Sequence, residues 1–144
     1  MNNNFDRKII LASHGGLSKG LKDSLEMIVG TANSPVEYYG LYPGENPQDI
    51  FESIKAEIDN NSEKEYIILT DLFGGSVCNA LLPLSIYKNV VIIAGMNLPL
   101  LMEIVLSSNS MLDSDNLKEV LTRARTSLLK AELRLDETFE LDDF

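Results

Sequence analysis

Four short apolar segments, each followed by a segment with helical periodicity, constrain the fold of this chain most strongly. The segments 8–13, 36–42, 66–70 and 90–94 are rich in β-branched and aromatic residues, which is typical of strands. Between them, apolar residues recur at helical spacing. Strands that alternate with helices predict an α/β fold, in which a doubly wound, mostly parallel sheet carries helices on both faces.

Five segments are expected to be helical: 18–29, 47–59, 76–87, 98–106 and 115–131. Asn46 and Asn97 are expected to cap the second and fourth helices. Pro83 lies inside the third and predicts a kink or an early stop. The fourth is apolar nearly all round, which predicts burial by the fold or by a partner chain. The apolar face expected on the last helix consists of Leu117, Val120, Leu121, Ala124 and Leu128.

A chain of 144 residues is long enough for one full hydrophobic core, and we expect a single domain over 1–144. Residues 1–5 are expected to form a loose amino-terminal end. The acidic segment 132–144 fits either a loose tail or a late strand added antiparallel to the sheet. Nothing before the first strand has the apolar stretch of a signal peptide, and the single cysteine, Cys78, fits a small buried residue in a reducing compartment.

The formal net charge of −10 argues against a nucleic-acid partner, because phosphate contacts require lysine and arginine side chains. The same charge is compatible with protein partners that present a basic face, and equally with solubility alone.

The single histidine of the chain, His14, ends the first predicted strand, and Asp71 follows the third. A strand order of 2-1-3-4 makes these two strands neighbours and places both side chains at the switch point, where such sheets bind ligands. A carboxylate beside an imidazole fixes its tautomer and stabilises its protonated form. The other ring nitrogen is then a nucleophile or base.

Glycine-rich turns accompany both residues: Gly15-Gly16 opens the first helix and Gly74-Gly75 the third. Backbone N–H groups and helix dipoles at such turns favour an anion, and Ser76 adds a hydroxyl donor. A nucleophilic imidazole in an anion cradle suggests a phosphohistidine intermediate. The alternatives are a structural histidine, a helix cap at Asp71 and glycines that serve tight turns only. No metal site is expected, because one histidine with scattered acids lacks a recognisable ligand spacing.

Four motifs occur in order along the chain: IILASHGG around His14, YPGENP at 42–47, LTDLFGGS at 69–76 and VVIIAGMNLPLLMEIV at 90–105. With them the chain resembles the cytoplasmic IIA domain of the mannose-type bacterial phosphoenolpyruvate-dependent sugar phosphotransferase system. Two departures lie at the edge of the site. Val77 stands where the family often has proline, and Cys78 where it often has an aromatic residue, whereas the aromatic position before the glycines is kept as Phe73.

The resemblance implies a cytoplasmic phosphotransferase without a cofactor, in which His14 is phosphorylated and Asp71 orients it. Ser76 and the loop 72–76 would help to hold the phosphoryl group. The donor implied is the phosphohistidine of the small carrier protein HPr. The acceptor is a separate IIB component, which serves the membrane IIC/IID complex. The family also implies a homodimer, in some members with a terminal strand exchanged, although 107–144 matches poorly.

Three other functions remain open on the sequence. A phosphotransfer subunit of a dihydroxyacetone kinase has a related fold and a histidine at a strand end, but the LFGGS and GMNLP stretches favour the sugar system. A regulatory binding module of the same fold would lack turnover. A flavodoxin-like flavin binder follows from the fold alone.

Overall fold

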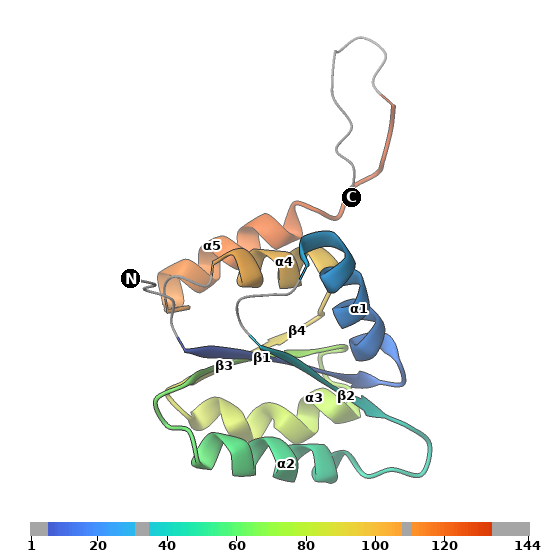
Figure 1. Ribbon diagram of the computed structural model, residues 1–144. Coiled ribbons are helices and arrows are strands. Elements are labelled where there is room, and N and C mark those ends of the chain that lie inside the picture. Colours follow the sequence, from blue (N-terminus) through green and yellow to red (C-terminus); the bar gives the residue numbers. More distant parts are fainter. Residues whose placement is uncertain (1–5, 31–34, 108–110, 134–144) are drawn as a thin grey trace.

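The computed structural model describes residues 6–30, 35–107 and 111–133 (Figure 1). Within these ranges a four-stranded sheet has the order β2-β1-β3-β4, and every pairing is parallel. The predicted fold class and strand order are therefore confirmed. The strands are β1 (Arg7–His14), β2 (Val36–Leu41), β3 (Glu65–Thr70) and β4 (Val90–Ala94).

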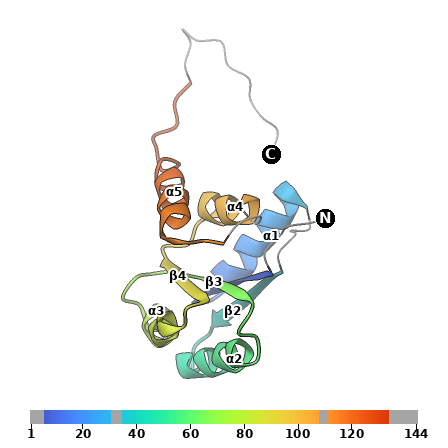
Figure 2. The same ribbon diagram turned by 90° about the vertical axis from the view of Figure 1, so that its left-hand side faces the viewer.

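Helices cover both faces of the sheet, as the alternation of strands and helices predicts. Three of them, α1 (Leu17–Val29), α4 (Leu98–Leu106) and α5 (Ser114–Arg125), lie on one side. On the other side lie α2 (Pro47–Asp59), α3 (Ser76–Leu81) and the short 3-10 helix η1 (Leu82–Ile86). Figure 2, turned by 90°, shows the same division.

Two hydrophobic cores result from the alternation of side chains along the strands. Ile9 and Leu11 of β1 point toward α1, α4 and α5, whereas Ile10 and Ala12 point toward α2 and α3. All six residues of β3 are buried, which is expected of a central parallel strand covered on both faces.

The caps predicted for α2 and α4 are confirmed. The side chains of Asn46 and Asn97 accept hydrogen bonds from the backbone N–H groups of Gln48 and Leu100, at 3.0 and 2.9 Å. The early stop is confirmed as well. The α-helix ends at Leu81 and continues as the 3-10 turn η1, because Pro83 has no N–H to donate.

The prediction for the last helix is wrong at its carboxyl end. Instead of reaching residue 131, α5 ends at Arg125. The hydroxyls of Thr126 and Ser127 donate to the carbonyls of Arg123 and Ala124, at 2.7 and 2.5 Å, and so compete with the helical pattern. Leu128 therefore does not join the apolar face; its side chain is 92 % exposed.

The fold itself buries most of α4. Leu100, Leu101, Ile104 and Val105 lie in the core, and Leu106 is exposed. Burial by the fold, rather than by a partner chain, thus accounts for most of its apolar surface. No helix in the described ranges is long and apolar enough to cross a membrane.

A buried ion pair closes the amino-terminal edge of the sheet. Nε of Arg7 donates to Oε1 of Glu65 at 2.5 Å. The same arginine donates to the carbonyl of Ile104, and the other Glu65 oxygen accepts from the N–H of Leu112. These contacts tie β1 and β3 to α4 and to the segment before α5. The expectations for residues 1–5 and 134–144 fall outside the described residues, and 126–133 form no strand.

Candidate active site

His14 and Asp71 meet at the carboxyl edge of the sheet, as the strand order predicts. His14 is the last residue of β1, and Asp71 directly follows β3. Nδ1 of His14 lies 2.7 Å from Oδ2 of Asp71. The histidine side chain is 50 % exposed and the aspartate side chain 12 %. The ring is therefore accessible, whereas the carboxylate that holds it is mostly covered.

Asp71 accepts three hydrogen bonds. Oδ2 accepts from the backbone N–H of His14 at 2.8 Å as well as from its ring, and Oδ1 accepts from the N–H of Leu72 at 2.7 Å. Partial burial opposes ionisation of the carboxyl group. The hydrogen bonds from His14 and Leu72 outweigh it, so the pKa of Asp71 lies below its ordinary value of 3.8. The carboxylate is thus ionised at neutral pH.

The ionised carboxylate decides the tautomer of His14. It can only accept, so Nδ1 carries the proton that it shares with Asp71. In the neutral ring, Nε2 therefore keeps its lone pair. The hydroxyl of Ser76 lies 3.0 Å from Nε2 and donates to it. The geometry leaves a half-exposed imidazole with one oriented, unprotonated nitrogen.

The predicted glycines surround this ring, but two of their N–H groups already have partners. Gly15 donates to the carbonyl of Leu41 at 2.8 Å, and Gly75 to that of Leu72 at 3.0 Å. Gly15 and Gly74 have φ angles of +56° and +85°, which other residues rarely adopt. A Cβ on Gly75 would lie 3.6 Å from Cε1 of His14. These glycines thus shape the turns that bring Ser76 to the ring.

Sequence reasoning missed two residues that hold the turn between His14 and α1 in place. The buried hydroxyl of Ser13 accepts from the N–H of Ser18 at 2.9 Å and thereby anchors the start of α1. On β2, a Cβ built on Gly40 would lie 2.5 Å from the carbonyl oxygen of Gly15. The signal for Ser13 was its place shortly before a helix. Nothing in the neighbouring sequence marked Gly40, because its partner, Gly15, lies in the turn after β1.

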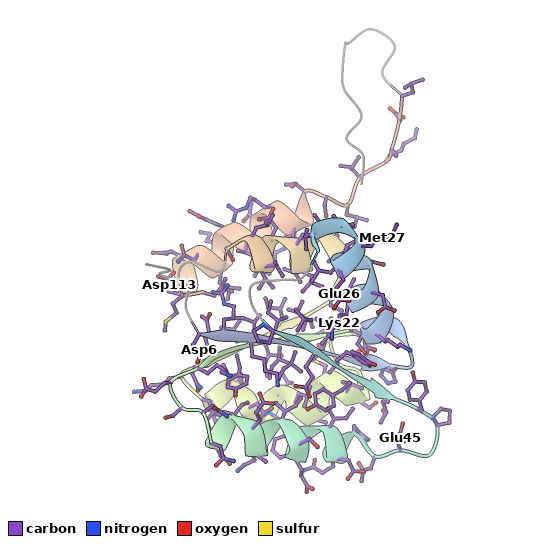
Figure 3. The ribbon with its side chains drawn as sticks, in the orientation of Figure 1. Asp6, Lys22, Glu26, Met27, Glu45 and Asp113 are labelled. Atoms are coloured by element: carbon purple, nitrogen blue, oxygen red, sulfur yellow. The ribbon has the colours of Figure 1, made fainter. Side chains whose placement is uncertain are left out.

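Four exposed apolar side chains lie in the loops and at the helix start around His14, and we call them the apolar rim: Leu17, Tyr42, Leu72 and Phe73. Phe73 is 77 % exposed at the tip of the turn after β3. Tyr42 sits in the loop after β2, where Figure 3 labels Glu45. Its N–H donates to the Glu45 carboxylate at 2.7 Å, which closes this loop. The rim makes the surroundings of His14 suited to contact with another protein.

Two other features lie apart from this site. In the described residues, no three His, Cys, Asp or Glu side chains gather as metal ligands. A cavity of about 450 Å³ opens between the end of β4, α4 and α5, and neither His14 nor Asp71 lines it. Residues that line it include Ile93, Gly95, Leu100, Leu121, Ala124 and Leu128.

Comparison with known proteins gives concordant results. The chain is 33 % identical over 107 residues to the sorbose-specific EIIA component of Lacticaseibacillus casei, which covers 72 % of this chain and 75 % of the relative. The crystal structure of the PTS IIA protein associated with the fucose utilization operon of Streptococcus pneumoniae is 37 % identical, with a TM-score of 0.75 over 88 % of this chain and 94 % of that one.

A second solved structure, the phosphotransferase system component EIIA from Streptococcus agalactiae, is 30 % identical. Its TM-score is 0.76, and the match covers 86 % of this chain and 96 % of that one. The sequence model of the EIIA-man family, described as the PTS system fructose IIA component, matches residues 8–122. The match includes His14, Asp71 and Ser76. The chain therefore belongs to the EIIA-man family and is a IIA component of the sugar phosphotransferase system.

Proposed function

We propose that this chain is a cytoplasmic phosphocarrier. His14 accepts a phosphoryl group from the phosphohistidine of HPr and passes it to a IIB component, which delivers it to sugar through the membrane IIC/IID complex. One observation carries the proposal. The Asp71 carboxylate takes both the backbone and the ring N–H of His14, at 2.8 and 2.7 Å, and leaves Nε2 as an oriented nucleophile.

The transfer needs no cofactor. The lone pair of Nε2 attacks the phosphorus of the donor's phosphohistidine. A new N–P bond forms, the donor's N–P bond breaks, and the donor imidazole keeps the electron pair. The ring of His14 becomes positive, and the adjacent Asp71 carboxylate stabilises that charge. Transfer to the IIB component is the same step in reverse, with His14 as the leaving group.

The loops supply the surroundings of the transferred group. Ser76, which donates to Nε2 at 3.0 Å in the free protein, can turn its hydroxyl toward a phosphoryl oxygen. Gly15, Gly74 and Gly75 keep the turns close to the ring without side chains. The amino end of α1, at Leu17, adds the positive end of a helix dipole near His14.

The openness of the site fits a protein donor and a protein acceptor. The ring is half exposed at an edge instead of lying in an enclosed cavity. Another protein's phosphohistidine must reach it, and the apolar rim offers the surface on which such a partner can dock. The relatives' names specify different sugars, among them sorbose and fructose. The IIA site touches only the phosphoryl group, so the choice of sugar belongs to other components.

A homodimer is part of the proposal. Leu128, Leu129 and Leu133 follow α5 with exposed side chains, and Leu128 lines the cavity beside β4. In the described residues the outer edge of β4 pairs with no strand, and an exposed apolar side chain such as Leu128 beside that edge favours a second copy as the cover. Two-fold dimers are the commonest assembly of this kind.

Intact-mass analysis after incubation with phosphoenolpyruvate, enzyme I and HPr tests the proposal. We expect one phosphate on the wild-type chain, lost again in acid, and none on His14→Ala. Circular dichroism checks that the variant folds, which we expect because the His14 side chain is half exposed. Phosphate on the alanine variant at the wild-type rate would contradict the assignment of His14. A wild-type chain that takes no phosphate would contradict the phosphocarrier function.

A further inference from the structure

The loop that carries Ser76 is held by a side chain that the proposed transfer does not use. Asn79, on α3, donates from Nδ2 to the carbonyl oxygen of Gly74 at 3.0 Å. Its own backbone N–H donates to the carbonyl of Gly75 at 2.9 Å. The N-cap residue of α3, Gly75, has no side chain with which to cap the helix. Asn79 thus reaches back from inside the helix to the turn that precedes it.

These bonds fix one peptide group, the one between Gly74 and Gly75. Its N–H donates to the carbonyl of Leu72 at 3.0 Å, and its C=O accepts from Asn79. A peptide between two glycines is the least restricted in a chain, because neither neighbour has a Cβ. Without the Asn79 bond, only one side of this group would be held. Gly74 has φ +85°, so no side chain at that position could stiffen the turn instead.

We infer that Asn79 is a positioning residue for phosphoryl transfer, acting through the Gly74–Gly75 peptide on Ser76 and the ring of His14. Hydrogen bonds of two residues hold the segment 71–76 in place. Asp71 fixes its start, through Leu72 N–H and His14. Asn79 fixes its end, where Gly75 lies beside Cε1 of His14 and Ser76 lies 3.0 Å from Nε2. Hydrogen-bond donors assist a transfer only when they are in place before the reaction.

This inference rests on the proposed function, and its test separates the two. The transfer rate from phosphorylated HPr is measured for the wild type, Asn79→Ala and Asn79→Asp. The aspartate keeps the size of asparagine but cannot donate to Gly74. The matched control is Asn60→Ala, which removes an amide-to-carbonyl bond of the same length, 3.0 Å, on exposed residues at the other end of the sheet.

A second readout does not depend on turnover. The chain contains one histidine, so labelling histidine with 15N gives the ring signals of His14 alone. Ser76→Ala removes the hydroxyl that donates to Nε2 and provides the reference shift for loss of that bond. If Asn79 positions Ser76, the Nε2 signal of Asn79→Ala should move in the same direction, whereas that of Asn60→Ala should stay at the wild-type position.

We expect both Asn79 variants to transfer phosphate about five- to tenfold more slowly, which is the change in rate that corresponds to the loss of one neutral hydrogen bond. Because the Asn79 side chain is exposed, the thermal midpoint of unfolding of both variants should stay within about 3 °C of the wild-type midpoint. Wild-type rates with unmoved ring signals would overturn the assignment. So would a midpoint that falls in parallel with the rate, since Asn79 would then only stabilise α3. If the wild-type chain takes no phosphate, the phosphocarrier function fails, and the Nε2 signal alone decides whether Asn79 positions the site.

Discussion

One oxygen of Asp71, Oδ2, accepts hydrogen bonds from both the backbone N–H and the ring Nδ1 of His14, at 2.8 and 2.7 Å. The carboxylate therefore fixes where β1 ends as well as how the ring is turned. The N-cap of α3 is Gly75, so Asp71 does not cap that helix, and a group that only held the turn after β3 would need the bond to Leu72 alone. The two hydrogen bonds from His14 make Asp71 part of the reacting unit in the proposed function.

Asp71→Asn should lower the transfer rate about a hundredfold or more, as loss of an orienting carboxylate does elsewhere. Three N–H groups point at the two carboxylate oxygens, and an amide has one oxygen only. Either Leu72 or His14 then faces an NH2 group. In the second case the ring adopts the other tautomer and Nε2 loses its lone pair. Stopped-flow transfer from phosphorylated HPr measures the rate, and an unchanged rate would leave Asp71 with no role beyond holding the turn after β3.

The stabilising effect of Asp71 should disappear in acid. Its pKa is lowered in the folded chain, so its contribution is complete above the unfolded value of about 3.9. The contribution is lost as the pH falls through the lower, folded value. The free energy of unfolding of the wild type should exceed that of Asp71→Asn at neutral pH, and the difference should shrink below about pH 4. Urea titrations at several pH values measure it. A difference that grows toward acid would contradict the direction of the shift.

Gly40→Ala should destabilise the fold by about 1–3 kcal/mol, the usual cost of an overpacked contact, and should slow transfer. The new Cβ would lie 2.5 Å from the carbonyl oxygen of Gly15, next to His14, so the loop has to move. Gly20→Ala on α1 is the control. A Cβ there meets nothing within 4 Å, and alanine should stabilise that helix by about 0.5–1 kcal/mol. If urea unfolding gave the same change in the free energy of unfolding for both substitutions, the close approach of Gly40 to the Gly15 carbonyl would be contradicted.

Phe73→Ala should raise the KM for phosphorylated HPr about tenfold and leave the fold intact. The side chain is 77 % exposed in the apolar rim, so its loss removes docking surface but little core. Ile86→Ala provides the control, because Ile86 is 83 % exposed at the other end of the sheet. Steady-state transfer at varied HPr concentration separates KM from kcat. If Ile86→Ala raised the KM as much, the rim would not be the docking surface.

The double substitution Leu128→Glu and Leu129→Glu should convert the proposed dimer to a monomer. Both side chains are exposed in one protomer, so two charges there leave the protomer core untouched. Leu101 would be a poor choice, because it is fully buried and a charge would unfold the chain. Light scattering at tens of micromolar gives the mass, with Ile86→Glu as the control. A wild-type chain of monomer mass would refute the dimer, and a dimer that survives truncation at Lys130 would exclude the tail as its main support.

Local patterns determined most of the elements. The span of β4, the caps Asn46 and Asn97 and the stop at Pro83 all follow from residues within one turn of the feature. Even the approach of His14 to Asp71 could be predicted, because right-handed crossovers leave few strand orders and both residues end neighbouring strands. The end of α5 was predicted wrongly, since apolar spacing through Leu128 concealed the competing hydroxyls of Thr126 and Ser127.

Only the tertiary structure decided the details of the site. Gly40 must be small because Gly15, in the turn after β1, lies against it. Asn79 can hold the loop because the turn before α3 folds back to the amide of this side chain. Neither partner is recognisable from neighbouring residues, since a contact between distant segments depends on strand register and loop path. The sequence by itself determined most of the elements and the approach of His14 to Asp71. Packing decided which backbone groups around His14 are already bonded, and which side chains keep the ring and Ser76 in place.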